Sequence, residues 1–268
     1  MARIQEVVQV RDTHLFVDDT GEADLPVILC LHSLFLDSRM FDGLVEAAAG
    51  KYRIIRPEFR GQGRSDLDDA DVITMDENAE DILALIDTMG LTDIHLVVQS
   101  MGGDVGVRVA ARRPELFRKM VMAGSSARGE THKEYVDWTE RASVHGFVGE
   151  VLEETMGIMF GATCLADPDR TAMVSLWRDR INAVPRRLRP AMMGVMTRES
   201  ALDLLPKIDF PVLIFSGTED NARPPAWAQE VADGLPHSEL VIFDRVGHSP
   251  TLEIPEIVYP RLLEFFQS

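Results

Sequence analysis

The chain of 268 residues is long enough for one large domain with a buried core, and its 46% hydrophobic and 26% charged residues are typical of a globular protein. Its formal charge of −17 argues against nucleic acid and anionic membranes as partners, because a polyanion would be repelled. Two cysteines are too few for a disulfide framework, and no apolar stretch approaches the length of about 20 residues that spans a bilayer. Since the N-terminus has no signal-peptide pattern, we expect a cytoplasmic protein.

Short apolar runs alternate with helical patterns along most of the chain. Two alternating segments, 4–10 and 14–18, predict an antiparallel hairpin. Runs rich in Val, Ile and Leu then predict strands buried on both faces, hence a parallel sheet covered by helices. These runs lie at 26–31, 52–57, 94–98, 119–123 and 211–215, and a further strand is predicted at 240–243. Helices are predicted at 75–89, at 225–235 and from Pro255 onwards.

The alternation is interrupted once, between Gly124 and about Leu205, where only helical stretches with many methionines occur. A structureless loop of that length would be improbable, so the pattern predicts an inserted helical cap. We expect a core domain of residues 1–124 and 206–268 and a cap of residues 125–205. Apolar cap side chains are predicted to bind the substrate, although at helical spacing such residues belong to a core more often. The predicted substrate-binding residues are Met156, Phe160, Trp177 and Met192.

Ser100 follows an apolar strand directly, and the two glycines at 102 and 103 open a helical pattern. This order predicts a sharp strand-to-helix turn, which holds the serine in a strained backbone conformation with its Oγ exposed. The turn also places Ser100 at a helix N-terminus, where the dipole favours developing negative charge. Val98 stands where the G-x-S-x-G pattern has its first glycine, so an ordinary strand-to-helix turn is the alternative.

An acid and a histidine each come just beyond the carboxyl end of a later predicted strand. His248 would take the Ser100 proton as general base and return it to the leaving group. Asp220 would fix the tautomer of His248 and stabilise its imidazolium form. Glu219 is the competing acid, but as the immediate neighbour its side chain should point away from that of Asp220.

Together these features resemble the α/β-hydrolase superfamily over almost the entire chain. The resemblance implies the α/β-hydrolase fold, with a mostly parallel eight-stranded sheet, helices on both faces and an inserted helical cap. The segment Leu31-His32-Ser33-Leu34 resembles the family's oxyanion loop, which would make the backbone N–H groups of Leu34 and Met101 the oxyanion donors. His32 itself is expected to be structural. The segment 56–66 resembles the family's D-x-R-G-x-G-x-S segment, with Glu58 and Gln62 at two altered positions, and is expected to be structural as well.

The stretch 32–41 is similar to the H-S-L-x-x-D-x-R-M-W/F loop of 3-oxoadipate enol-lactonases and their relatives, and the paired prolines at 224 and 225 also resemble that group. This resemblance implies hydrolysis of a carboxylic ester or lactone through an acyl-enzyme. The apolar cap favours a small to medium apolar or aromatic substrate. Arg178 and Arg180 are available for an acidic substrate, but exposure to solvent is the more frequent fate of such residues.

Other readings of the same residues remain open. A C–C bond hydrolase of ring-fission products and a cofactor-free perhydrolase use the same triad and fold, whereas dehalogenases and epoxide hydrolases need an aspartate at position 100. A hormone-receptor-like homologue would bind its ligand without useful turnover. We expect no metal and no cofactor, since His132 and His145 are isolated and no cluster has ligand spacing. A small molecule is the expected partner, and a homodimer is left open.

Overall fold

The computed structural model describes residues 3–130 and 134–268, which leaves His132 outside the described residues, and its centre is an eight-stranded sheet. The strands are β1 (Ile4–Val10), β2 (Thr13–Asp19), β3 (Val27–Leu31), β4 (Arg53–Pro57), β5 (Ile94–Gln99), β6 (Phe117–Ala123), β7 (Val212–Gly217) and β8 (Ser238–Phe243). Their order is β1-β2-β4-β3-β5-β6-β7-β8. The pairs β1–β2 and β2–β4 are antiparallel and the others are parallel, so the predicted hairpin and parallel sheet are confirmed.

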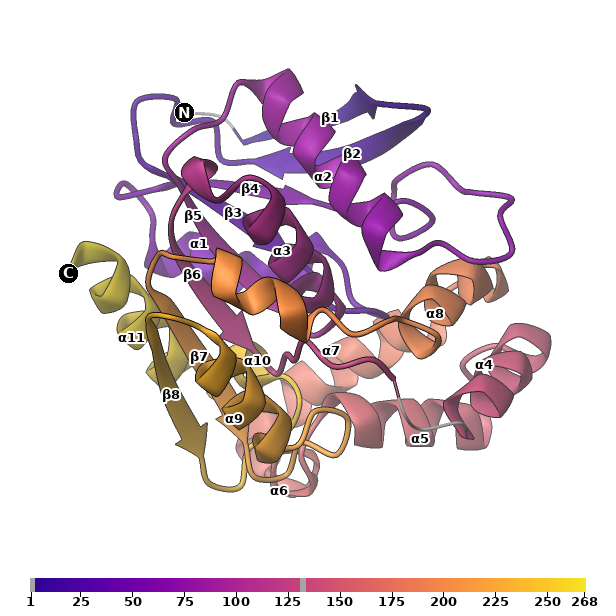
Figure 1. The fold of residues 1–268 in the computed structure, drawn as a ribbon. Helices are drawn as coiled ribbons and strands as arrows, with labels where there is room; N and C mark the ends of the chain where they lie inside the picture. Colours follow the sequence, from indigo (N-terminus) through magenta and orange to yellow (C-terminus); the bar gives the residue numbers. More distant parts are fainter. Residues whose placement is uncertain (1–2, 131–133) are drawn as a thin grey trace.

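Helices cover both faces of this sheet (Figure 1). On one face lie α2 (Met75–Met89), α3 (Met101–Arg112) and α9 (Pro225–Gly234); on the other lie α1 (Asp42–Ala47) and α11 (Pro255–Gln267), with the short α10 (Pro250–Glu253) before it. The structure confirms the predicted bounds of the helix 75–89. These bounds were predictable because both ends of the helix carry strong sequence signals. Thr74 and Glu77 form a capping box at its start, and Gly90 ends it in the left-handed conformation.

Between β6 and β7 the described residues form five helices, and these gather beyond one end of the sheet (Figure 1). They are α4 (Glu134–His145), α5 (Gly149–Met159), α6 (Ala162–Ala166), α7 (Thr171–Asn182) and α8 (Arg189–Met196), and we call this group the cap helices. Short 3₁₀ turns complete the chain at Ser38–Phe41, Pro114–Leu116, Pro168–Arg170, Arg186–Leu188 and Leu202–Lys207. No strand occurs among the described residues of this insertion.

Burial explains why the central strands were visible as apolar runs. Every residue of β5 and of β7 is buried, since helices pack on both faces of these strands. Parallel strands end at the same edge of a sheet, so the loops that follow β3, β5, β7 and β8 converge there. These loops carry Leu34, Ser100, Asp220 and His248.

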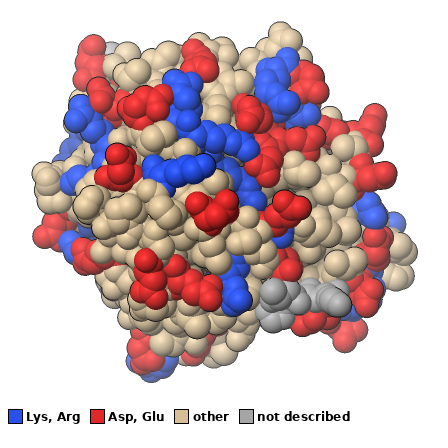
Figure 2. Space-filling model, viewed as in Figure 1, with Lys and Arg blue, Asp and Glu red and all other residues tan. Residues whose placement is uncertain are grey.

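The surface carries many ion pairs. On the face shown in Figure 2, basic side chains form a band with acidic side chains on its borders. Ion pairs connect neighbouring helices, as between Arg112 Nη1 of α3 and Glu80 Oε1 of α2 at 2.7 Å. No helix within residues 3–130 and 134–268 is long and apolar enough to cross a membrane.

Candidate active site

Ser100 lies at the turn between β5 and α3 with strained backbone angles, φ 52° and ψ −117°. Residues other than glycine rarely adopt a positive φ, and such backbone strain persists only where the surrounding structure imposes it. The surroundings do so here because α3 packs very close to β3. A Cβ on Gly102 would lie 2.1 Å from the carbonyl oxygen of Leu31, so only glycine permits this approach. The tight turn holds Ser100 at the N-terminus of α3, as predicted.

His248 and Asp220 form a buried hydrogen-bonded pair. The His248 Nδ1 lies 3.0 Å from Asp220 Oδ1 and 2.9 Å from Asp220 Oδ2, and both residues are almost fully buried. The backbone N–H groups of Ala222 and Arg223 donate to Asp220 Oδ1 at 3.0 and 2.7 Å, which fixes the carboxylate. With an ionised Asp220, Nδ1 carries the proton of a neutral imidazole and Nε2 is the acceptor.

Ser100 and His248 line the same cavity. No hydrogen bond joins the Ser100 Oγ to His248 or to any other described residue. Catalytic hydrogen bonds often form only when substrate is bound. The loop of His248 is fixed against β6, because a Cβ on Gly124 would lie 2.2 Å from the His248 carbonyl oxygen.

Two further carboxylates connect the catalytic loops to the cap helices. Glu253 is buried and accepts hydrogen bonds from the backbone N–H groups of Gly247 and Ser249, on either side of His248, and of Gly161 in the cap. Burial raises the pKa of Glu253, against the effect of these three donors. Glu219 instead binds the backbone N–H and hydroxyl of Thr163 at 2.8 and 2.6 Å. Its side chain therefore points away from His248, and Asp220 is the acid that lies against the imidazole.

The two predicted oxyanion donors are unsatisfied within the described part of the chain. Met101 is the first residue of α3, so its N–H has no helical partner, and the N–H of Leu34 donates no hydrogen bond to a described residue. Leu34 lines the cavity beside Ser100, and both residues are buried. Buried N–H groups without partners are rare in proteins, which makes these two groups candidates for binding a substrate oxygen.

His32 supports this loop, as expected. Its Nδ1 donates to the Ser33 carbonyl oxygen at 2.8 Å, and its Nε2 accepts from the Phe59 N–H at 3.1 Å. Burial lowers the pKa of His32, which keeps the imidazole neutral and suited to this pair of bonds.

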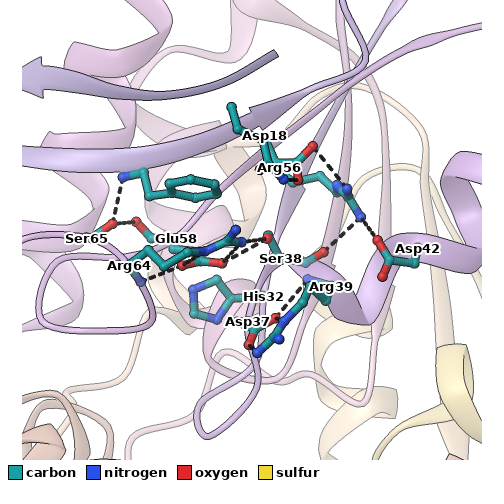
Figure 3. Close-up of polar contacts among 12 residues, drawn as sticks. Asp18, His32, Asp37, Ser38, Arg39, Asp42, Arg56, Glu58, Arg64 and Ser65 are labelled. Atoms are coloured by element: carbon teal, nitrogen blue, oxygen red, sulfur yellow. Dashed lines mark hydrogen bonds and ion pairs between the residues drawn. The ribbon is translucent and has the colours of Figure 1, made fainter. Parts of the chain in front are cut away.

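A polar network fixes the segment that carries Leu34 (Figure 3). The buried Glu58 accepts hydrogen bonds from Ser38 Oγ at 2.9 Å and from Arg64 Nη2 at 2.6 Å. The buried Arg56 donates to the Ser38 carbonyl oxygen at 3.1 Å and pairs with Asp42 and Asp18. The segment 56–66 therefore has the structural role that was expected for it, and the substituted Glu58 performs part of that role.

The cavity at Ser100 has a volume of about 40 Å³. Ligand pockets usually measure roughly 300–1,000 Å³, so this cavity is smaller than a typical ligand site. Its apolar lining comes from both core and cap: Leu34, Phe35, Ile158, Met159, Val195, Met196 and Ala222. Its other lining residues are Ser33, Ser100, Glu130, Tyr135, Arg223 and His248.

The structure does not place the four predicted substrate-binding residues at this cavity, and that prediction is corrected. Met156, Phe160, Trp177 and Met192 are almost fully buried among other side chains. Helical periodicity explains the difference, because neighbours two to four positions away on α5 and α8 face Ser100 instead. Arg178 pairs with Glu153 at the surface, and neither Arg178 nor Arg180 lines the cavity.

Comparison with known proteins identifies the family of the chain. The family model of the alpha/beta hydrolase fold matches residues 26–255. The chain belongs to this family. An esterase structure from Thermogutta terrifontis is 27% identical, with a TM-score of 0.86, and covers 100% of this chain and 98% of that chain.

Two other relatives are more distant in sequence. The enol-lactonase structure from Burkholderia xenovorans LB400 is 22% identical with a TM-score of 0.90, and it covers 98% of this chain and 100% of that chain. RutD of Agrobacterium fabrum, which carries the name of a carbamate hydrolase, is 24% identical over 94% of this chain and 97% of its own length. Family and relatives together indicate a hydrolase of the ester-hydrolysing type.

Sequence reasoning missed a ring of four buried charges in this hydrolase: Asp104, Glu130, Arg198 and Arg223. Asp104 lies 3.3 Å from Arg198 and 3.0 Å from Arg223, and Glu130 lies 2.9 Å from Arg198 and 3.5 Å from Arg223. Burial lowers the pKa of Arg198, and the positive charge of Arg223 lowers it further. No local pattern could have revealed the ring, because its members are brought together from four distant segments.

Proposed function

We propose that this protein is a serine hydrolase that cleaves a carboxylic ester or lactone through an acyl-enzyme. One observation carries the proposal: a strained Ser100 at the start of α3 shares a cavity with a His248 whose Nδ1 is bound to the buried Asp220. A serine and a histidine base at one cavity, with an acid bound to the other nitrogen of that histidine, form the arrangement that activates a hydroxyl for acyl transfer.

Acylation follows from this geometry. The Ser100 Oγ attacks the scissile carbonyl carbon while His248 Nε2 accepts the hydroxyl proton. The carbonyl oxygen becomes an oxyanion, to which the N–H groups of Leu34 and Met101 donate. Donors already in place at the developing charge need no reorganisation during the reaction, and one such donor contributes about 10²–10³ in rate.

Collapse of the tetrahedral intermediate completes the first half-reaction. The bond to the leaving oxygen breaks, His248 returns its proton to that oxygen, and the acyl group stays on Ser100. Water then attacks the acyl carbon while His248 takes one of its protons, and Ser100 leaves as the restored hydroxyl. Asp220 holds the imidazole in the required tautomer throughout.

The lining of the cavity supports a small to medium apolar or aromatic substrate, since its apolar lining residues include Leu34, Phe35, Ile158, Met159 and Val195. We assign residues 125–205 to a cap that closes over this substrate, because Tyr135 of α4, Ile158 of α5 and Val195 of α8 all line the cavity.

The test is a panel of p-nitrophenyl esters, lactones and vinylogous C–C substrates, assayed with the wild type and with Ser100→Ala. The proposal expects turnover of esters or lactones by the wild type alone. Turnover of the C–C substrates alone would replace the ester assignment, and equal turnover by both proteins would remove Ser100 from the mechanism.

A further inference from the structure

Glu253, the last residue of α10, binds the loop of His248 on both sides of that histidine. Its Oε1 accepts the N–H of Ser249 at 3.0 Å, and its Oε2 accepts the N–H of Gly247 at 2.9 Å. Glu253 is only 2% exposed, so water competes little for these oxygens. Both hydrogen bonds come from backbone groups, and the carboxylate therefore fixes the path of the chain through His248.

The same carboxylate also binds the cap helices. Its Oε2 accepts a third hydrogen bond, at 3.2 Å, from the N–H of Gly161, the residue directly before α6. One oxygen atom is thus shared by α6 and by the residue that precedes His248. A movement of Gly161 relative to Gly247 would lengthen one of the two bonds to this oxygen.

Gly161 and Gly247 also pack backbone against backbone. A Cβ on Gly247 would lie 2.0 Å from the nitrogen of Gly161, and a Cβ on Gly161 would lie 2.8 Å from the nitrogen of Gly247. No side chain fits between backbones that approach this closely. Gly161 has φ −65°, which any residue adopts, so its close contacts, and not its backbone angles, exclude a side chain there.

A carboxylate is the group that fits these three donors. Both of its oxygens accept hydrogen bonds, whereas a glutamine would place an NH₂ group against at least one backbone N–H. Burial raises the pKa of Glu253, while the three N–H groups and the charge of His248 act in the opposite direction. The loop that Glu253 holds therefore stabilises the ionised form of Glu253 in return.

We propose that Glu253 is a positioning residue through which α6 of the cap helices sets the position of His248. The three hydrogen bonds and the glycine contact join α6 to the residues on both sides of the histidine, so a displacement of α6 moves the imidazole relative to Ser100. A displacement of about 1 Å can cost about 10² in rate. The inference rests on the proposed function for the role of His248 as general base.

Gly161→Ala tests the contact from the side of the cap helices. The added Cβ would lie 2.8 Å from the nitrogen of Gly247 and 2.6 Å from Glu219 Oε2, so α6 and the loop of His248 must move apart. Gly157→Ala is the matched control, because Gly157 lies on the neighbouring α5 and an added Cβ there would meet no atom within 4 Å.

Glu253→Gln tests the carboxylate. The variant keeps the size of the side chain but removes one of its two acceptor oxygens. Glu219→Gln is its control, since the Glu219 side chain also binds α6 but does so through Thr163 and not through the residues beside His248.

Two measurements are made on all four variants. Steady-state hydrolysis of the best p-nitrophenyl ester should show kcat lowered about tenfold or more in Gly161→Ala and Glu253→Gln, with KM within about threefold of the wild type, because a displaced base slows the chemical step. Hydrogen–deuterium exchange followed by mass spectrometry should show exchange about tenfold faster in peptides covering residues 245–252 of the same two variants. Both controls should match the wild type, and thermal unfolding checks that all four fold.

Unchanged exchange at residues 245–252 in both Gly161→Ala and Glu253→Gln would overturn the inference. An unchanged kcat, a change confined to KM, or equal effects in the controls would do the same. If Glu253→Gln does not fold, Gly161→Ala and Gly157→Ala decide. The exchange measurement needs no substrate, so a protein whose His248 loop responds to Gly161→Ala but which hydrolyses no ester would refute the proposed function and leave the coupling between α6 and this loop intact.

Discussion

Replacement of Asp220 by asparagine tests whether Asp220, and not the neighbouring Glu219, is the acid that orients His248. In the structure Asp220 Oδ1 already accepts the N–H groups of Ala222 and Arg223. An asparagine oxygen would keep these bonds, which turns its amide group toward His248 Nδ1. That nitrogen would then become an acceptor and Nε2 would carry the proton, so His248 could not take the proton of Ser100.

We expect Asp220→Asn to lower kcat/KM by about 10⁴, which corresponds to about 5.5 kcal/mol of transition-state stabilisation. The assay is steady-state hydrolysis of the best p-nitrophenyl ester, with circular dichroism to check the fold. Glu219→Gln is the matched control, because Glu219 contacts Thr163 of the cap and not His248, and it should retain kcat/KM within about tenfold. A severe loss in Glu219→Gln with a mild loss in Asp220→Asn would refute the assignment of the acid.

Three further predictions concern stability and local geometry. Burial, with neighbouring cations, lowers the pKa of His95 to about 4, below its ordinary value of 6.5, so its contribution to stability is present above pH 6.5 and is lost as the pH falls toward 4. His95→Phe should therefore reduce the loss of unfolding free energy between pH 7.5 and pH 5 by about 2 kcal/mol, measured by urea denaturation. The pKa of Asp18 is lowered to about 2, because hydrogen bonds from arginines and a glutamine outweigh the opposing effect of burial, so its stabilisation is present above pH 3.8 and is lost as the pH falls toward 2. Asp18→Asn should cost about 2 kcal/mol at pH 7 and much less near pH 2, and an equal cost at both pH values would contradict the argument. Gly102→Ala should push α3 away from Leu31 and lower kcat/KM by roughly 10², since small displacements of a nucleophile such as Ser100 are costly; an unchanged rate would show that the close approach is not required.

The sequence predicted the sheet well because its strands carry their signal locally. Strands such as β5 are buried on both faces and appear as continuous apolar runs, and α2 has a capping box and a terminal glycine. The short α1 was not predicted, because it has no comparable amphipathic pattern. Only one of its six residues, Leu44, is buried.

The loops of the site were predictable for a related reason. Ser100, Asp220 and His248 each follow a recognisable strand, and parallel strands bring their carboxyl ends together. The cap lining was not predictable, since the side of α5 or α8 that faces Ser100 depends on how these helices dock. Small rotations of a helix decide whether Met156 or Met159 reaches the cavity, and the sequence pattern does not define that rotation.

The measurement that tests the central claim most directly is covalent labelling with a fluorophosphonate probe, followed by peptide mass spectrometry. Activated serines react with such probes because the phosphonyl group takes the place of the acyl group on the serine oxygen. We predict one adduct, located on Ser100, in the wild type and none in Ser100→Ala. An adduct on another residue, or equal labelling of both proteins, would contradict the assignment of Ser100 as the nucleophile.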